Sequence, residues 1–135
     1  MKNMLKLSIV ILILLNACKD NHPFERVYSF WVENKSDKPV YFLVSYIYPD
    51  TTIPDTYNEI GLVSPNSKNP IDSDKKWEEV FKELPADTLS VFIFSSREAI
   101  SINNWQEIRS EYKILKRYDI SIDDLKNNSW IISYP

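Results

Sequence analysis

Apolar and β-branched residues gather in two stretches near the start of the chain, in the manner of β-strands. Arg26 to Glu33 and Val40 to Tyr48 are both rich in aromatic and branched residues, which favour strands. Polar, turn-forming residues fill positions 34–39 between them. The pattern predicts an antiparallel hairpin. Both faces of the second strand are largely apolar, so we expect it to be central and covered on both sides.

The next stretch, Pro49 to Pro70, is predicted to be a long loop because it contains four prolines and many Asp, Thr, Asn and Ser residues. The pattern allows one short strand within it, at Glu59 to Val63. A loop of this length is either functional or packed by its own side chains, and its residues do not distinguish the two.

A helix is the clearest element of the middle of the chain, from Asp74 to Leu84. Its apolar residues follow the i, i+3, i+4, i+7 spacing of one helix face: Trp77, Val80, Phe81 and Leu84. Asp74 is the expected N-cap and Pro85 ends the helix. Core packing is the expected role of Trp77 and Phe81, in preference to lining a ligand pocket.

The second half of the chain alternates strands and helices. Thr88 to Phe94 is predicted to be a central strand, and Asn103 to Tyr112 an amphipathic helix that begins with a capping box. Ile114 to Asp119 carries charge on both faces, as edge strands do. Ser121 to Leu125 begins a short helix with acids in its first turn. Trp130 to Tyr134 closes the chain as the last strand.

These elements predict an α+β fold. We expect a predominantly antiparallel sheet of about five strands, with two to three short helices packed on it and the helix at residues 74–84 covering one face. The alternative is an immunoglobulin-like sandwich with helical insertions. The β-α-β order in the second half leaves parallel pairing of some strands open.

The N-terminal residues do not belong to this fold. Two lysines precede an apolar run from Leu7 to Leu15, and the run ends at Leu15-Asn16-Ala17-Cys18. This is the pattern of a signal peptide. The four residues resemble the lipobox of bacterial lipoproteins, which implies cleavage before Cys18 and lipidation of its thiol. A spanning helix would need about 20 apolar residues, more than this run has.

We therefore divide the chain into a signal peptide at residues 1–17, a lipidated N-terminus and tether at residues 18–24, and a single globular domain at residues 25–135. Two acyl chains hold a protein stably on a membrane, so the membrane is the first expected partner. Lys19, rather than Asp, follows the cysteine. By resemblance this favours the outer membrane, in either leaflet.

The composition agrees with one soluble domain on an anchor. The chain has 135 residues, 44% hydrophobic and 13% aromatic, far from a disordered profile. Loss of residues 1–17 removes two of the 16 basic residues, so the formal charge becomes 16 − 2 − 19 = −5. An acidic domain without a clustered basic patch argues against nucleic-acid binding.

The C-terminal part of the chain carries a resemblance to a known family. The segments that carry it are Asp87 to Phe94, Trp105 to Tyr112, Leu115 to Leu125 and Trp130 to Pro135. Together with the lipoprotein signal they resemble a family of small, uncharacterised lipoproteins from Gram-negative gut bacteria. The resemblance implies a location and one folded unit, and it implies no activity.

Catalytic and metal-binding patterns are absent from the sequence. The only histidine, His22, lies in the tether, and Cys18 is the only cysteine, so neither a nucleophile-base pair nor a His-rich zinc site is expected. Asp72 and Asp74 lack the glycine and distal glutamate of a calcium loop. With Gly61 as the only glycine, no phosphate-binding loop is expected. We expect no cofactor.

Adjacent acids on the predicted helices are poor candidates for an acid pair. The pairs are Glu78-Glu79 and Asp123-Asp124. Neighbouring helical residues diverge by about 100° around the axis, so their carboxylates do not converge.

The sequence thus favours a non-catalytic envelope module that binds a protein partner. The alternative is a carbohydrate-binding or sensing lipoprotein, in which exposed aromatic residues stack on sugar rings. The candidates for stacking are Trp31, Tyr46, Tyr48 and Tyr57. An apolar patch of several hundred Å² would favour a protein partner. An enzyme is the weakest of the three readings.

Overall fold

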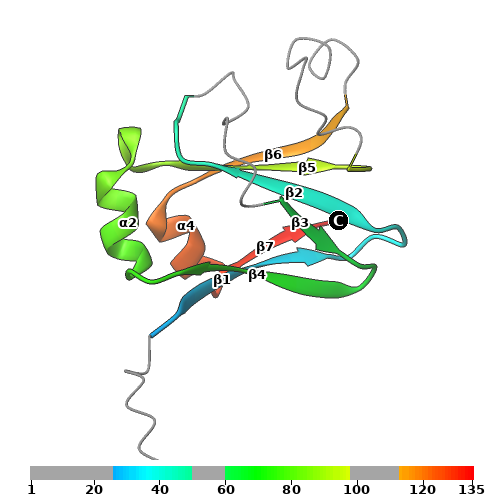
Figure 1. Cartoon of the computed structure of the whole chain (residues 1–135), viewed down its shortest axis with the longest axis horizontal. Helices are drawn as coiled ribbons and strands as arrows, with labels where there is room; N and C mark the ends of the chain where they lie inside the picture. The colour runs from blue at the N-terminus through cyan, green and yellow to red at the C-terminus, as the bar shows by residue number, and fades with distance from the viewer. Residues whose placement is uncertain (1–25, 50–59, 98–112) are drawn as a thin grey trace, which may run out of the picture.

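The computed structural model describes residues 26–49, 60–97 and 113–135. Its fold is α+β, as predicted, and has two sheets with helices at one end (Figure 1). The strands are β1 (Tyr28–Asn34), β2 (Val40–Ser45), β3 (Ile60–Val63), β4 (Ser67–Ser73), β5 (Leu89–Phe94), β6 (Ile114–Ile120) and β7 (Ile131–Tyr134). The helices are α2 (Trp77–Glu83), α4 (Ile122–Asn127) and the 3₁₀ turn η1 (Pro85–Asp87).

The strands divide between two sheets, where the sequence predicted one sheet of about five. A three-stranded sheet has the order β4-β1-β7 and a four-stranded sheet has the order β3-β2-β5-β6. All pairs are antiparallel except β1 with β7. β2 and β5 are central and β6 is an edge strand, as predicted.

The predicted hairpin of the first two strands is wrong, because β1 and β2 lie in different sheets. β1 pairs with β4, and β2 pairs with β3. The segment that forms β1 and β2 bends after Asn34. The segment that forms β3 and β4 pairs with it and bends at the same place, between Val63 and Ser67. The four strands therefore form one long ribbon that is bent across both sheets.

Strand β4 begins inside the stretch, Pro49 to Pro70, that the sequence predicted to be a loop. Its polar residues and Pro70 predicted a loop instead of a strand, since proline is rare in strands. β4 is at the edge of its sheet, and an edge strand tolerates proline because one side of its backbone needs no partner. The short strand expected near residues 59–63 is confirmed as β3.

The main core lies between the sheets. Phe30 and Val32 from β1 meet Val91 and Ile93 from β5, all fully buried. Leu43, Phe92 and Phe94 point the other way, as the alternation of side chains in a strand requires, into a second apolar cluster. Both faces of β2 and β5 are thus covered, as their sequences required.

Helices α2 and α4 close one end of the space between the sheets (Figure 1). Trp77 and Phe81 of α2 are 2% and 1% exposed, as the helix pattern predicted. The expected N-cap at Asp74 is wrong. The helix begins at Trp77, with Lys76 in the N-cap position and no side-chain cap, and Ser73 accepts a hydrogen bond from the Lys75 backbone N–H in the turn before it.

The C-terminal elements follow the prediction closely. Ser121 caps α4 in a reciprocal capping box with Asp124, and β7 follows after a short turn. Tyr118 of β6 donates its hydroxyl to the Ser133 carbonyl of β7 over 2.7 Å, which ties the two sheets together. The expected helix at residues 103–112 lies outside the described residues. In the described ranges, no helix is long and apolar enough to cross a membrane.

Candidate functional site

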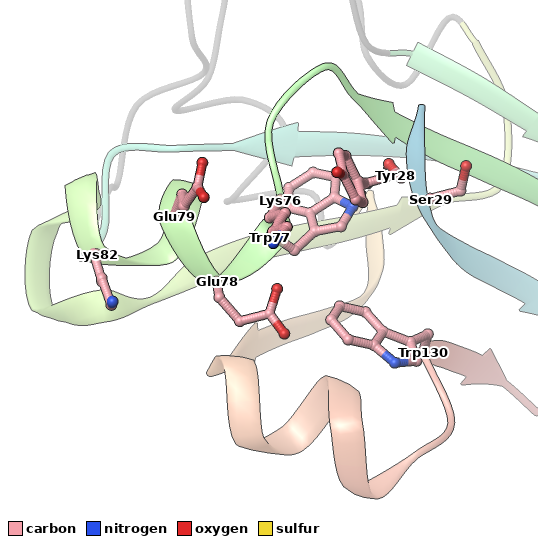
Figure 2. Close-up of a pocket in the computed structure, with 8 residues that line it drawn as sticks. All are labelled: Tyr28, Ser29, Lys76, Trp77, Glu78, Glu79, Lys82 and Trp130. Carbon is pink, nitrogen blue, oxygen red and sulfur yellow. Dashed lines mark hydrogen bonds between the residues drawn. The ribbon is translucent and has the colours of Figure 1, made fainter. Parts of the chain in front are cut away.

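The structure contains a cleft of about 620 Å³ at the helical end of the molecule. It lies where the start of β1, helix α2 and the turn before β7 meet (Figure 2). Its lining is aromatic and charged: Tyr28, Ser29, Lys76, Trp77, Glu78, Glu79, Lys82 and Trp130. These residues come from three separate parts of the chain, so the fold alone brings them together.

The inner wall of the cleft is formed by Trp77, a buried side chain held by one hydrogen bond and two aromatic contacts. Its indole N–H donates to the Tyr28 carbonyl over 3.0 Å, which satisfies the one polar atom of the ring. The ring of Phe30 packs edge-on against it with centroids 4.7 Å apart, and Phe81 follows at 6.3 Å. Trp77 is therefore a core residue that also supports Tyr28.

The outer wall is Trp130, which a tight turn holds in an unusual backbone conformation. The Trp130 N–H donates to the Leu125 carbonyl over 2.7 Å, and the Ser129 N–H donates to Lys126 over 3.2 Å. These two bonds are the Schellman pattern that ends a helix. Ser129 has φ 56° and Trp130 has φ 63°. Positive φ at a bulky aromatic residue is rare and strained, and such strain clusters at functional sites.

Charges of both signs surround the aromatic walls. Glu78 pairs with Lys126 of α4 over 3.2 Å. Its own backbone N–H, and then Lys126, hold the pKa of Glu78 below its usual value. Glu78 therefore stays ionised near neutral pH. Figure 2 shows the Glu78 and Glu79 side chains pointing in different directions, as their adjacent positions on a helix predicted.

This arrangement is suited to binding. Partly buried aromatic rings offer a large contact area at low entropic cost, and lysines and glutamates offer directional contacts to polar groups. The structure groups no three His, Cys, Asp or Glu side chains at metal-binding distance within its described part. Asp72, one half of the weak calcium candidate, accepts a hydrogen bond from the Ser29 hydroxyl.

Of the aromatic residues predicted to stack on sugars, the three that the structure describes do not form one group. Trp31 is on the three-stranded sheet, whereas Tyr46 packs partly buried against the main core. Tyr48 lies under the Arg117 guanidinium at 6.0 Å. Tyr57 lies outside the described residues, as do Cys18 and His22, so the predicted lipidation site and tether are not described.

Sequence reasoning missed Tyr28 and Trp130 as lining residues, because both were assigned to strands. Trp130 in fact precedes β7 and belongs to the turn. A signal for that turn is present in Asn127-Asn128-Ser129, since such residues commonly follow a helix end. No comparable signal marks Tyr28, whose place in the cleft depends on helix α2.

Comparison with protein-family models, with curated proteins and with solved structures returned no match for this chain. The geometry of the site and the N-terminal motif therefore carry the functional argument.

Proposed function

We propose that this protein is a lipid-anchored protein of the bacterial cell envelope that binds a protein partner and catalyses no reaction. The anchor is Cys18, by the resemblance of residues 15–18 to a lipobox, and the outer membrane is the favoured location. The binding site is the cleft between α2 and Trp130.

The observation that carries the proposal is that Trp130 lines the cleft from a strained backbone conformation. The turn holds this large residue at φ 63° and places its ring on the cleft, where it is partly exposed. Part of the ring packs against the main core, which fixes the orientation of the part that lines the cleft. Tryptophan and tyrosine are the residues that most often dominate the energy of protein interfaces, and Tyr28 lies across the same cleft.

The charges of the cleft also favour a protein segment. Lys76 and Lys82 stand beside Glu78 and Glu79, so the lining has no net charge. A peptide carries donors, acceptors and side chains of both signs, and it can match such a lining. The adjacent glutamates diverge, which supports binding over acid-base hydrolysis, since glycoside hydrolysis needs two facing carboxyl groups about 5–9.5 Å apart.

The test is chemical cross-linking of the lipidated protein in its own membrane, followed by identification of the attached proteins. A defined set of partners is expected for the natural protein and is expected to be lost for Trp130→Ala. Leu115→Ala is the matched control, because Leu115 is exposed on β6, away from the cleft. Retention of the same partners by Trp130→Ala would contradict the proposed site.

A carbohydrate is the second candidate ligand, and one observation favours it. Tyr28 and Trp130 present two partly exposed rings to one cleft, and aromatic rings stack on the apolar faces of sugars. Binding of the purified protein to a panel of envelope glycans, abolished by Trp130→Ala, would establish this alternative in place of a protein partner.

A further inference from the structure

The outer face of the three-stranded sheet carries a second feature, which shares Ser29 with the cleft. Phe30, Val32 and Ile71 point inward and are buried. The alternating residues therefore point outward. Cross-strand register arranges them in three rows that run across the strands.

The middle row is apolar. Trp31 is level with Pro70 on β4 and with Ile131 on β7. Trp31 is 38% exposed, so part of this large apolar side chain faces the solvent. Trp31 also sits at the centre of the β1–β4 ladder, which runs from Tyr28 to Asn34. The apolar row thus divides the face into two halves.

The two polar rows carry opposite charge. On one side Glu33 is paired with Lys68 and with Lys35, each at 3.4 Å, and it accepts a hydrogen bond from Ser133 over 2.7 Å. Two lysines against one glutamate leave one positive charge in excess. On the other side Asp72 and Ser29 are hydrogen-bonded to each other, which leaves one negative charge.

We propose that this face binds the same face of a second copy of the chain, about a two-fold axis that lies between the faces and runs across the strands. Such an axis reverses the direction of the strands and keeps each residue at the same position across the sheet. Trp31, Pro70 and Ile131 then stack on their own counterparts. Lys68 of one copy faces Asp72 of the other, so the charge pattern is complementary to itself, as two-fold interfaces require.

The size of the face predicts a weak dimer. Three strands about 4.8 Å apart and about 20 Å long cover roughly 300 Å² in plan. This is well below the roughly 800 Å² per partner of a stable interface. Confinement to a membrane raises the effective concentration of the copies, so the association is expected on the membrane and only at high concentration in solution.

The experiment is cross-linking of the full-length, membrane-bound protein with a short bismaleimide. Pro70→Cys places a thiol on the axis and leaves Trp31 intact. A flexible linker is needed because packed sheets lie about 10 Å apart, too far for a direct disulfide. We expect a cross-linked dimer for Pro70→Cys and none for the matched control Lys38→Cys, which places a thiol in the exposed turn before β2. Thermal unfolding checks that both variants fold.

Three single variants and one double variant in the Pro70→Cys background test the contacts. Trp31→Ser is expected to lower the yield of dimer by about ten-fold, as loss of a central tryptophan does. Lys68→Asp and Asp72→Lys should each lower it, because each places like charges opposite one another. The double variant Lys68→Asp with Asp72→Lys should restore it.

Equal cross-linking of Pro70→Cys and Lys38→Cys would overturn the proposal, and so would a double charge variant as weak as the single ones. Cross-linking of Pro70→Cys to a different protein would show that the face has another occupant. None of these variants changes Trp130, so failure here is distinct from failure of the proposed cleft.

Discussion

Because Gly61 has no side chain, an aromatic ring on the neighbouring strand can pack directly against its backbone. Gly61 and Phe42 are cross-strand partners, and a Cβ atom at Gly61 would lie 2.1 Å from two atoms of the Phe42 ring. The ring therefore fills the space that a side chain would occupy. Phe42 is 3% exposed, so it has little room to move away.

Gly61→Ala is accordingly expected to lower the free energy of unfolding by about 1–3 kcal/mol through overpacking. Chemical denaturation measures the change. The double variant Gly61→Ala with Phe42→Leu should lose less than the sum of the two single losses, since the smaller side chain removes the clash. Simple additivity would contradict the proposed contact.

Ser129 offers the opposite case, a position where glycine would fit better. It occupies the left-handed position of the helix-ending turn, with φ 56°, where glycine is the usual residue. Ser129→Gly is expected to raise the free energy of unfolding by about 0.5–1 kcal/mol, because a side chain is strained at this φ. Thermal unfolding would test this, with Ser133→Gly in strand β7 as the control that should destabilise.

At the scale of elements, the bend of the long ribbon depends on Asn34. This residue is fully buried at the corner. Its amide donates to the Lys38 and Val63 carbonyls over 2.7 and 3.0 Å, and its oxygen accepts from the Ser36 backbone and hydroxyl. One side chain thus satisfies the backbone at both corners of the ribbon.

Asn34→Ala is expected to cost about 1–3 kcal/mol of unfolding free energy, because the buried Val63 carbonyl would lose its partner. Denaturation measures the loss, and Ser36→Ala, which removes only a partly exposed hydroxyl, should cost clearly less. Equal losses would show that the contact to Val63 contributes little.

The capping box of α4 predicts a pH dependence. The Ser121 backbone N–H, and then its hydroxyl, hold the pKa of Asp124 below its usual value. A carboxyl with a lowered folded pKa contributes stability that is present above its unfolded pKa and is lost as the pH falls through the folded one. Ser121→Ala removes the hydroxyl bond to the carboxylate and the bond that the hydroxyl accepts from the Asp124 N–H.

We therefore expect Ser121→Ala to cost about 0.5–2 kcal/mol at neutral pH. The difference from the natural protein should shrink as the solution is acidified below the usual Asp124 pKa. A carbon-detected titration should also show a higher Asp124 pKa in the variant. A cost that stays constant with pH would mean that the carboxylate plays no part in the cap.

At the scale of the whole molecule, the prediction concerns Cys18. Cys18→Ala is expected to leave an unlipidated, uncleaved precursor, because only a thiol can form the thioether to diacylglycerol. Metabolic labelling with a fatty acid and the migration of the protein on a gel measure both effects. Ala17→Ser, which keeps a small residue before the cysteine, is the matched control and should be processed. A normally processed, membrane-bound Cys18→Ala product would refute the anchor.

Local sequence patterns determined the parts of this protein that depend on neighbouring residues. Alternation placed Leu89, Val91 and Ile93 on one face of β5 and its phenylalanines on the other, because side-chain direction in a strand depends only on position. Helical spacing identified the buried face of α2. Ser121 predicted the start of α4, since its cap is formed within one turn.

Tertiary structure decided which strands pair and where the cleft lies. The alternation of side chains along a strand does not specify which strand it pairs with. The bend at Asn34 could therefore place β1 and β2 in different sheets without changing the alternation in either strand. In the sequence Pro70 predicted a loop, whereas in the structure it lies in an edge strand. Tyr28, Trp77 and Trp130 are far apart in the chain, and they meet only because α2 and α4 close the same end of the two sheets.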